Sequence, residues 1–115
     1  MMDNDGVEVL IGEEVIRVLL ETFDLGIVFS NWHLELFTTF TLHRTAGGSV
    51  VYDPSVKSGD LNILWDLVGR SVQESRFENG LFLTFDNAAR LELMQRPDRD
   101  AGRLQSRDWK RGEDF

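Results

Sequence analysis

Two histidines and a large number of carboxylates are the side chains in this sequence that could carry acid–base or metal chemistry. His33 and His43 lie ten positions apart on what the pattern predicts to be one strand. At ~3.3 Å per residue they would be about 33 Å apart, which is too far for a shared metal ion. We therefore expect no metal and no cofactor. An enzyme that uses His33 or His43 together with a carboxylate remains one hypothesis.

The sequence also lacks the motifs of nucleophilic catalysis and phosphate binding. It has no Gly-x-Ser-x-Gly elbow, no Gly-Lys-Ser/Thr loop and no cysteine. The absence of cysteine excludes a disulfide scaffold and cysteine-ligated zinc, and it agrees with a cytoplasmic location. We predict no catalytic residues.

Acidic residues dominate the first 94 positions, which hold 15 Asp/Glu against 6 Lys/Arg, and the whole chain has a net charge of −8. Such a surface repels phosphate backbones and attracts basic surfaces, so we expect a basic protein partner and no nucleic acid. The candidate contacts are carboxylates near predicted turns and strand ends, and one tryptophan among charges. They are Glu13, Glu14, Glu21, Asp24, Glu78 and Trp109.

Membrane-targeting features are not visible in the sequence. No apolar run approaches the roughly 18 residues that a membrane span needs, and the first residues are acidic without an apolar signal region. We expect a cytoplasmic protein that does not associate with membranes.

The elements that position these residues follow from an internal repeat. Leu10-Ile11-Gly12-x-x-Val15 returns as Leu67-Val68-Gly69-x-x-Val72, Leu25-x-Ile27-x-Phe29-x-Asn31 as Leu81-x-Leu83-x-Phe85-x-Asn87, and Leu34-Glu35-Leu36 as Leu91-Glu92-Leu93. The alternating apolar residues in each copy bury one face of a sheet. We predict two three-stranded antiparallel meanders, over about 10–36 and 67–93.

The segments between the two copies have their own patterns. Apolar residues at helical spacing predict a core-packed helix over about 60–68, with Trp65 buried. The alternating run 32–43 predicts one long strand. The helix would join the two meanders and cover one sheet face.

Residues 95–115 break the repeat pattern. Arginines recur there at helical spacing, yet like charges one turn apart destabilise an isolated helix. We expect a flexible tail, with docking on the acidic body through Leu104 and Trp109 as the alternative. Residues 1–115 would thus form a single α+β domain, a mostly antiparallel β roll or sandwich built from two meanders and one linking helix. A homo-oligomer that forms through the edge strands of this domain is also possible.

Two copies of Leu-Val/Ile-Gly-x-x-Val, each followed by a hairpin and Leu-Glu-Leu, resemble a family of small, uncharacterised bacterial domains. Members are sometimes grouped with immunity proteins of polymorphic toxin systems. The resemblance covers about residues 9–95. The segments Phe40-Thr41-Leu42, Val51-Tyr52-Asp53-Pro54 and Leu64-Trp65-Asp66-Leu67-Val68-Gly69 also carry it. The family pattern continues with a Glu-x-Trp segment and a further strand, from which Asp98 to Phe115 departs, with Asp108-Trp109 as an echo. The resemblance implies no catalytic residues.

Three functional hypotheses follow, in this order. The first is a non-enzymatic protein-binding domain, such as an immunity protein that masks a basic toxin. The second is a small-molecule-binding β-roll with an apolar cavity between the two repeat faces. The third is the enzyme with a histidine–carboxylate pair.

Overall fold

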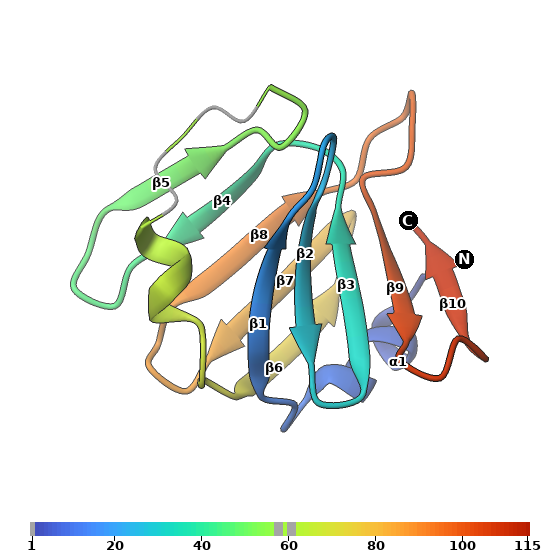
Figure 1. Cartoon of the computed structure of the whole chain (residues 1–115), viewed down its shortest axis with the longest axis horizontal. Helices are drawn as coiled ribbons and strands as arrows, with labels where there is room; N and C mark the ends of the chain where they lie inside the picture. Colours follow the sequence, from blue (N-terminus) through green and yellow to red (C-terminus); the bar gives the residue numbers. More distant parts are fainter. Residues whose placement is uncertain (1, 57–58, 60–61) are drawn as a thin grey trace.

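The computed structural model of the chain is a sandwich of two five-stranded antiparallel sheets (Figure 1). It describes residues 2–56, 59 and 62–115. The predicted mostly antiparallel β architecture is confirmed, with short helical turns at Asn4–Val7 (α1), Glu8–Leu10 (η1) and Asn62–Asp66 (η2). No helix within the described ranges is long and apolar enough to cross a membrane. The cytoplasmic location stays a prediction.

The strand order brings together segments that are far apart in the sequence. The first sheet runs in the order β1 (Val15–Leu20), β2 (Leu25–Phe29), β3 (Trp32–Leu36), β9 (Gly102–Ser106) and β10 (Gly112–Asp114). The second runs in the order β5 (Ser49–Tyr52), β4 (Phe40–His43), β8 (Arg90–Met94), β7 (Gly80–Phe85) and β6 (Val72–Phe77). β1 and β6 are thus edge strands, and each begins a meander.

The two meanders, β1–β2–β3 and β6–β7–β8, have matching registers. Pairing begins at Val15 in β1 and at Val72 in β6, and in both cases the register shifts immediately afterwards, which marks a β-bulge. The meanders meet where Glu14 and Ser71 form an isolated antiparallel bridge. The internal repeat also predicts that residues 10–36 and 67–93 superpose about a pseudo-twofold axis, and this stays a prediction.

The linking helix differs from the expected α-helix over 60–68. The structure has the five-residue 3-10 helix η2 in its place, and the first two positions of the predicted range lie outside the described residues. Side chains at i and i+3 align on a 3-10 turn. Leu64 and Leu67 are accordingly both buried, and Trp65 between them is 76% exposed. The prediction of a buried Trp65 is wrong.

The predicted strand over 32–43 is two strands in different sheets. β3 ends at Leu36 and β4 begins at Phe40, and the residues between them carry the chain from one sheet to the other. The apolar alternation continues through this crossing because both strands bury alternate side chains in the same core. His33 and His43 therefore belong to opposite sheets.

The C-terminal region forms strands, so the expectation of a flexible tail is wrong. β9 pairs with β3, with Leu104 opposite Leu34, and β10 pairs back onto β9. Leu104 and Phe115 are buried, whereas Trp109, the other expected anchor, is 71% exposed. Without β9, β3 would be an edge strand with unpaired backbone N–H and C=O groups, and the C-terminal segment pairs with these groups. The spacing of the arginines does not predict this pairing.

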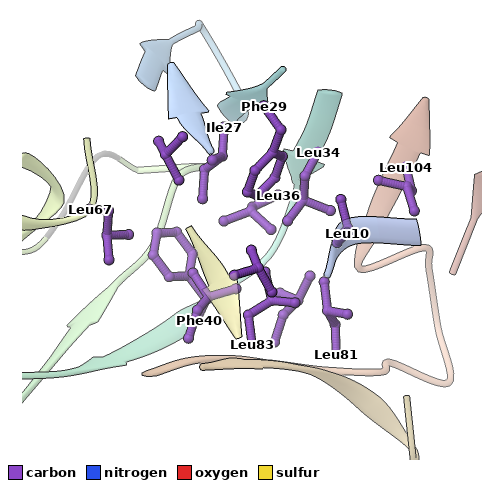
Figure 2. Close-up of a cluster of buried hydrophobic side chains, with 14 of the residues drawn as sticks. Leu10, Ile27, Phe29, Leu34, Leu36, Phe40, Leu67, Leu81, Leu83 and Leu104 are labelled. Carbon is purple, nitrogen blue, oxygen red and sulfur yellow. The ribbon is translucent and has the colours of Figure 1, made fainter. Parts of the chain in front are cut away.

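Aliphatic and aromatic side chains from both meanders fill the space between the sheets (Figure 2). The labelled members of this core are Leu10, Ile27, Phe29, Leu34, Leu36, Phe40, Leu67, Leu81, Leu83 and Leu104. Burying each such side chain stabilises the fold by about 1.5 to 3 kcal/mol. Among the described residues, these side chains occupy the space in which a ligand-binding roll would hold its ligand.

Candidate functional site

An apolar groove of about 300 Å³ opens at the edge of the sandwich, between β1 and η2. Its lining is apolar apart from one arginine, and consists of Ile16, Arg17, Val18, Leu20, Leu64, Trp65 and Val68. Ile16 is 44% exposed and Leu20 is 60% exposed, and both lie near the exposed indole of Trp65. Exposed large apolar side chains that gather on a small protein mark a candidate interaction site.

The topology explains why the apolar side chains of β1 stay open. Val18 and Leu20 pair with Ile27 and Leu25, so they point to the inner face of the first sheet. β1 is the edge strand, and among the described residues η2, rather than a strand of the second sheet, lines the space beside it (Figure 1). We expected the apolar residues of each meander to bury one face of the sheet, and at β1 this expectation is wrong, because Leu20 is 60% exposed.

The corresponding surface at β6 is covered by the start of the chain. Ser75 Oγ donates a hydrogen bond to the carbonyl oxygen of Val7 at 2.7 Å. Asn4 Oδ1 accepts one from the backbone N–H of Phe77 at 2.6 Å. The Phe77 ring also packs edge-on against Phe115, with ring centroids 5.7 Å apart. The two ends of the chain thus close the free edge of β6.

Leu20 occupies in β1 the position that Phe77 occupies in β6. Each residue ends its strand, and they pair with Leu25 and Leu81, respectively. Hydrogen-bonded positions alternate along an antiparallel pair, so the matching register directs the Leu20 N–H toward the free edge, as it directs that of Phe77. Within the part of the chain that the structure describes, no side chain accepts from Leu20 as Asn4 does from Phe77.

The candidate carboxylates do not form one patch. Glu13 is committed to the fold, because its carboxylate accepts hydrogen bonds from the backbone and side-chain N–H groups of Asn31 at 2.6 and 2.9 Å. Glu14 and Glu21 are exposed directly before and directly after β1, so they flank the groove strand. Glu78 is exposed on the other sheet, in the β6–β7 turn, 3.3 Å from an arginine of β6.

Asp24 belongs to a small acidic cluster on the outer face of the first sheet, where its carboxyl group lies close to that of Glu35. Burial raises the pKa of Glu35, and the neighbouring charges of Asp24 and Glu21 raise it further. The sequence analysis missed Glu35 as a site residue. The predicted β2–β3 hairpin could have indicated it, because the register of this hairpin places Glu35 beside Gly26 and near the β1–β2 turn.

His33 lies in the same cluster. Burial lowers the pKa of its imidazole, while the charges of Glu21 and Asp24 act in the opposite direction. Its Nε2 atom is buried and has no hydrogen-bond partner among the described residues. A Cβ at Gly26 would lie 2.7 Å from that Nε2, so a residue with a side chain does not fit beneath the ring.

His43 lies on the outer face of the second sheet, 3.2 Å from a carboxylate oxygen of Glu92. Their mutual orientation is not that of a hydrogen bond, since His43 Nε2 has no such partner in the described residues. No group of three His, Asp or Glu side chains that could hold a metal ion occurs in the described ranges. The structure thus brings each histidine close to carboxylates, but on separate sheets.

Trp109 lies in the β9–β10 turn, at the opposite edge of the first sheet from β1. Its backbone is left-handed, with φ 64°, and its N–H donates to the carbonyl oxygen of Ser106 at 3.0 Å. Asp108 accepts hydrogen bonds from Ser106 Oγ and from the N–H of Lys110, which tightens the same turn. Trp109 is therefore an exposed candidate contact that is separate from the groove.

Comparison of the chain with models of protein families, with curated proteins and with solved structures finds no match. The groove is not among the sites predicted from the sequence. The sequence feature that belongs to the groove is the pair of large apolar residues Ile16 and Leu20. Both lie in β1, which the topology places at the edge of its sheet. Strand order is a tertiary property, so the exposure of these residues follows only from the assembled sheets.

Proposed function

We propose that this chain is a non-enzymatic protein-binding domain with a basic protein as its partner, a role like that of an immunity protein that masks a basic toxin. The observation that carries the proposal is the exposed apolar groove at β1. Leu20 and Trp65 hold large apolar surfaces in water there, and a partner that covered them would gain about 25 cal/mol for each Å² of apolar surface removed from water.

The charge of the chain supports a basic partner. The net charge is −8, and exposed carboxylates at Glu14 and Glu21 stand at both ends of the groove strand. Apolar surface in the centre with charges at the rim is the usual composition of a protein–protein interface. The rim charges would mainly accelerate association, and the apolar centre would slow dissociation.

We further propose that the domain consists of two copies of one structural unit. Support comes from hydrogen bonds that repeat after a shift of 57 residues along the sequence. The N–H of Val15 donates to the carbonyl oxygen of Arg70 at 2.8 Å, and the N–H of Val72 donates to that of Glu13 at 3.0 Å. An experimental structure in which 10–36 and 67–93 superpose strand on strand is the test.

A small apolar ligand is the second candidate occupant of the groove. The volume of about 300 Å³ lies at the lower limit for small-molecule sites, which typically enclose most of their ligand. This groove is open along β1, with Leu20 and Trp65 at its surface. That openness favours a protein partner over a small molecule.

The test of the proposed function uses basic proteins encoded next to the gene for this chain. Each is titrated onto the native chain by calorimetry, and the association rate is measured at several salt concentrations. We expect one of them to bind, with slower association at high salt and in the double variant Glu14→Lys, Glu21→Lys. Glu74→Lys, an exposed change on β6, is the matched control and should have a smaller effect. If none of these proteins binds the native chain, the proposal is contradicted.

A further inference from the structure

We propose that β1 is a strand-addition site, at which an extended segment of the basic partner pairs with the free edge and places alternate apolar side chains in the groove. This inference rests on the proposed function and specifies the part of the partner that is recognised. The backbone of Val15, the first residue of β1, is already hydrogen bonded to Gly69 and Arg70. The open part of β1 is therefore at most residues 16–20, and a segment paired with it is about 16 Å long at ~3.3 Å per residue.

β1 is open along part of one side. It pairs with β2 on the other side, and at its first residue Val15 donates to the carbonyl oxygen of Arg70 and accepts from the N–H of Gly69. Beyond Val15, no other strand among the described residues pairs with this side. The alternation of an antiparallel ladder turns the N–H and C=O groups of Val18 and Leu20 toward that free side. An unpaired row of donors and acceptors beside exposed apolar side chains is the arrangement that binds an added strand.

The matching edge at β6 shows what covers such a strand in this chain. At β6, Asn4 accepts the outward N–H of Phe77, and Val7 is fully buried. The chain thus satisfies the β6 edge with one polar contact to the backbone and with apolar side chains. The β1 edge presents the same two requirements, an outward N–H at Leu20 and apolar surface at Ile16 and Trp65. A partner segment would meet both.

Charge favours a basic partner over a second copy of this chain. A second copy that paired through β1 would bring its own Glu14 and Glu21, and a net charge of −8, to the same edge. Like charges directly opposite each other destabilise a strand pair. A segment with Lys or Arg at both ends places opposite charges at the same positions, so the complementary occupant is an apolar extended segment with basic ends.

The experiment selects ligands for the native chain from a displayed library of random 12-residue peptides. We expect the selected sequences to share alternating apolar residues with Lys or Arg at both ends. A synthetic peptide of the selected sequence should bind about tenfold more weakly to Leu20→Ser and to Trp65→Ala than to the native chain. Both residues are exposed, so the variants keep the fold.

The matched controls are exposed apolar residues on the second sheet. Val51→Ser on β5 and Met94→Ala on β8 remove comparable apolar surface away from the groove, and should leave the affinity within about twofold. Selected peptides whose binding is equally sensitive to the control variants, or a selection that yields no binding peptide, would overturn the inference.

Hydrogen exchange separates strand addition from side-chain contact alone. The bound peptide should slow exchange at the amides of Val18 and Leu20, because these N–H groups become hydrogen bonded. Binding without slower exchange at these amides rejects strand addition. A native dimer that Leu20→Ser dissociates, measured by analytical ultracentrifugation, would assign β1 to a second copy instead and would equally overturn the inference.

The natural partner distinguishes the inference from the proposed function. If a basic partner binds, and the charge reversals at Glu14 and Glu21 weaken it while Leu20→Ser and Trp65→Ala do not, the function stands and strand addition fails. If no basic protein binds the native chain, the proposed function fails as well.

Discussion

The edges at β1 and β6 have the same strand register and opposite surroundings. Leu20 ends β1 with its side chain 60% exposed, whereas Phe77, in the matching position of β6, contacts Asn4 and Phe115 from the two ends of the chain. Strand pairing alone therefore does not decide whether an edge is open. The difference arises from where the segments outside the two meanders pack, and within the described residues it leaves the β1 edge more open than the β6 edge.

The outer faces of the two sheets differ in a similar way. Glu35 on β3 and Glu92 on β8 have matching places in the repeated Leu-Glu-Leu segments. Glu35 lies close to the carboxyl group of Asp24, and Glu92 lies 3.2 Å from the imidazole of His43. The same residue in the same register thus lies next to an acid on one sheet and next to a base on the other.

The largest effect is expected where the two halves are alike. Leu10 and Leu67 occupy matching positions and are both fully buried, so Leu10→Ala and Leu67→Ala should each lower the free energy of unfolding by about 2 to 5 kcal/mol. Denaturation in urea measures both. A loss under about 1 kcal/mol for either variant would mean that the cores of the two halves are not equivalent.

A smaller loss should accompany the opening of the β6 edge. Asn4→Ala removes the acceptor of the Phe77 N–H, and Ser75→Ala removes the donor to Val7. Each variant should lower the free energy of unfolding by about 1 kcal/mol, the usual contribution of one hydrogen bond. Gln95→Ala, at an exposed position after β8, is the control and should change it by less than about 0.5 kcal/mol.

If Asn4→Ala is neutral, the N-terminal segment does not stabilise β6, and the contrast with β1 loses its basis. Faster hydrogen exchange at the amide of Phe77 in this variant is the direct check. At β1 we expect fast exchange at Leu20 in the native chain, since its N–H faces the free edge.

The groove itself should contribute little to stability. Trp65 is exposed, so Trp65→Ala should lower the free energy of unfolding by less than about 1 kcal/mol. Trp32, which is 8% exposed, is the control, and Trp32→Ala should lower it by about 3 to 5 kcal/mol. Equal losses for the two variants would show that Trp65 is packed, and that the groove is part of the core.

The smallest effect concerns pH and the outer faces. Burial and Asp24 hold the pKa of Glu35 above its ordinary value of 4.5, so the folded chain binds this proton more tightly than the unfolded chain. The protonated Glu35 carboxyl therefore makes its full contribution to the free energy of unfolding at pH below 4.5, and this contribution is lost as the pH rises through the folded pKa. Glu35→Gln should make the chain more stable than the native one at pH 7, with a difference that shrinks toward pH 4.

Urea denaturation across this pH range measures the effect, and Glu92→Gln provides the comparison on the second sheet. Because Glu92 lies beside His43 rather than beside an acid, its replacement should bring no gain in stability at pH 7. A gain for both variants, or for neither, would remove the contrast between the two outer faces.

The sequence alone was sufficient for the strands of the two meanders, because alternating apolar residues report local backbone geometry. Leu25, Ile27 and Phe29 lie in β2, and Leu81, Leu83 and Phe85 lie in β7, as the alternation predicts. The acidic charge of the chain is also a property of the sequence, and with it the expectation of a basic partner.

Tertiary structure decided the remaining features. It turned the predicted helix into a 3-10 turn that exposes Trp65, divided 32–43 between two sheets, and gave the tail a place as β9 beside β3. It also left β1 at an edge, which creates the groove. The physical reason is common to all four. Strand order and cover depend on contacts between segments distant in sequence, and an apolar residue has the same local pattern whether its neighbour is another strand or water.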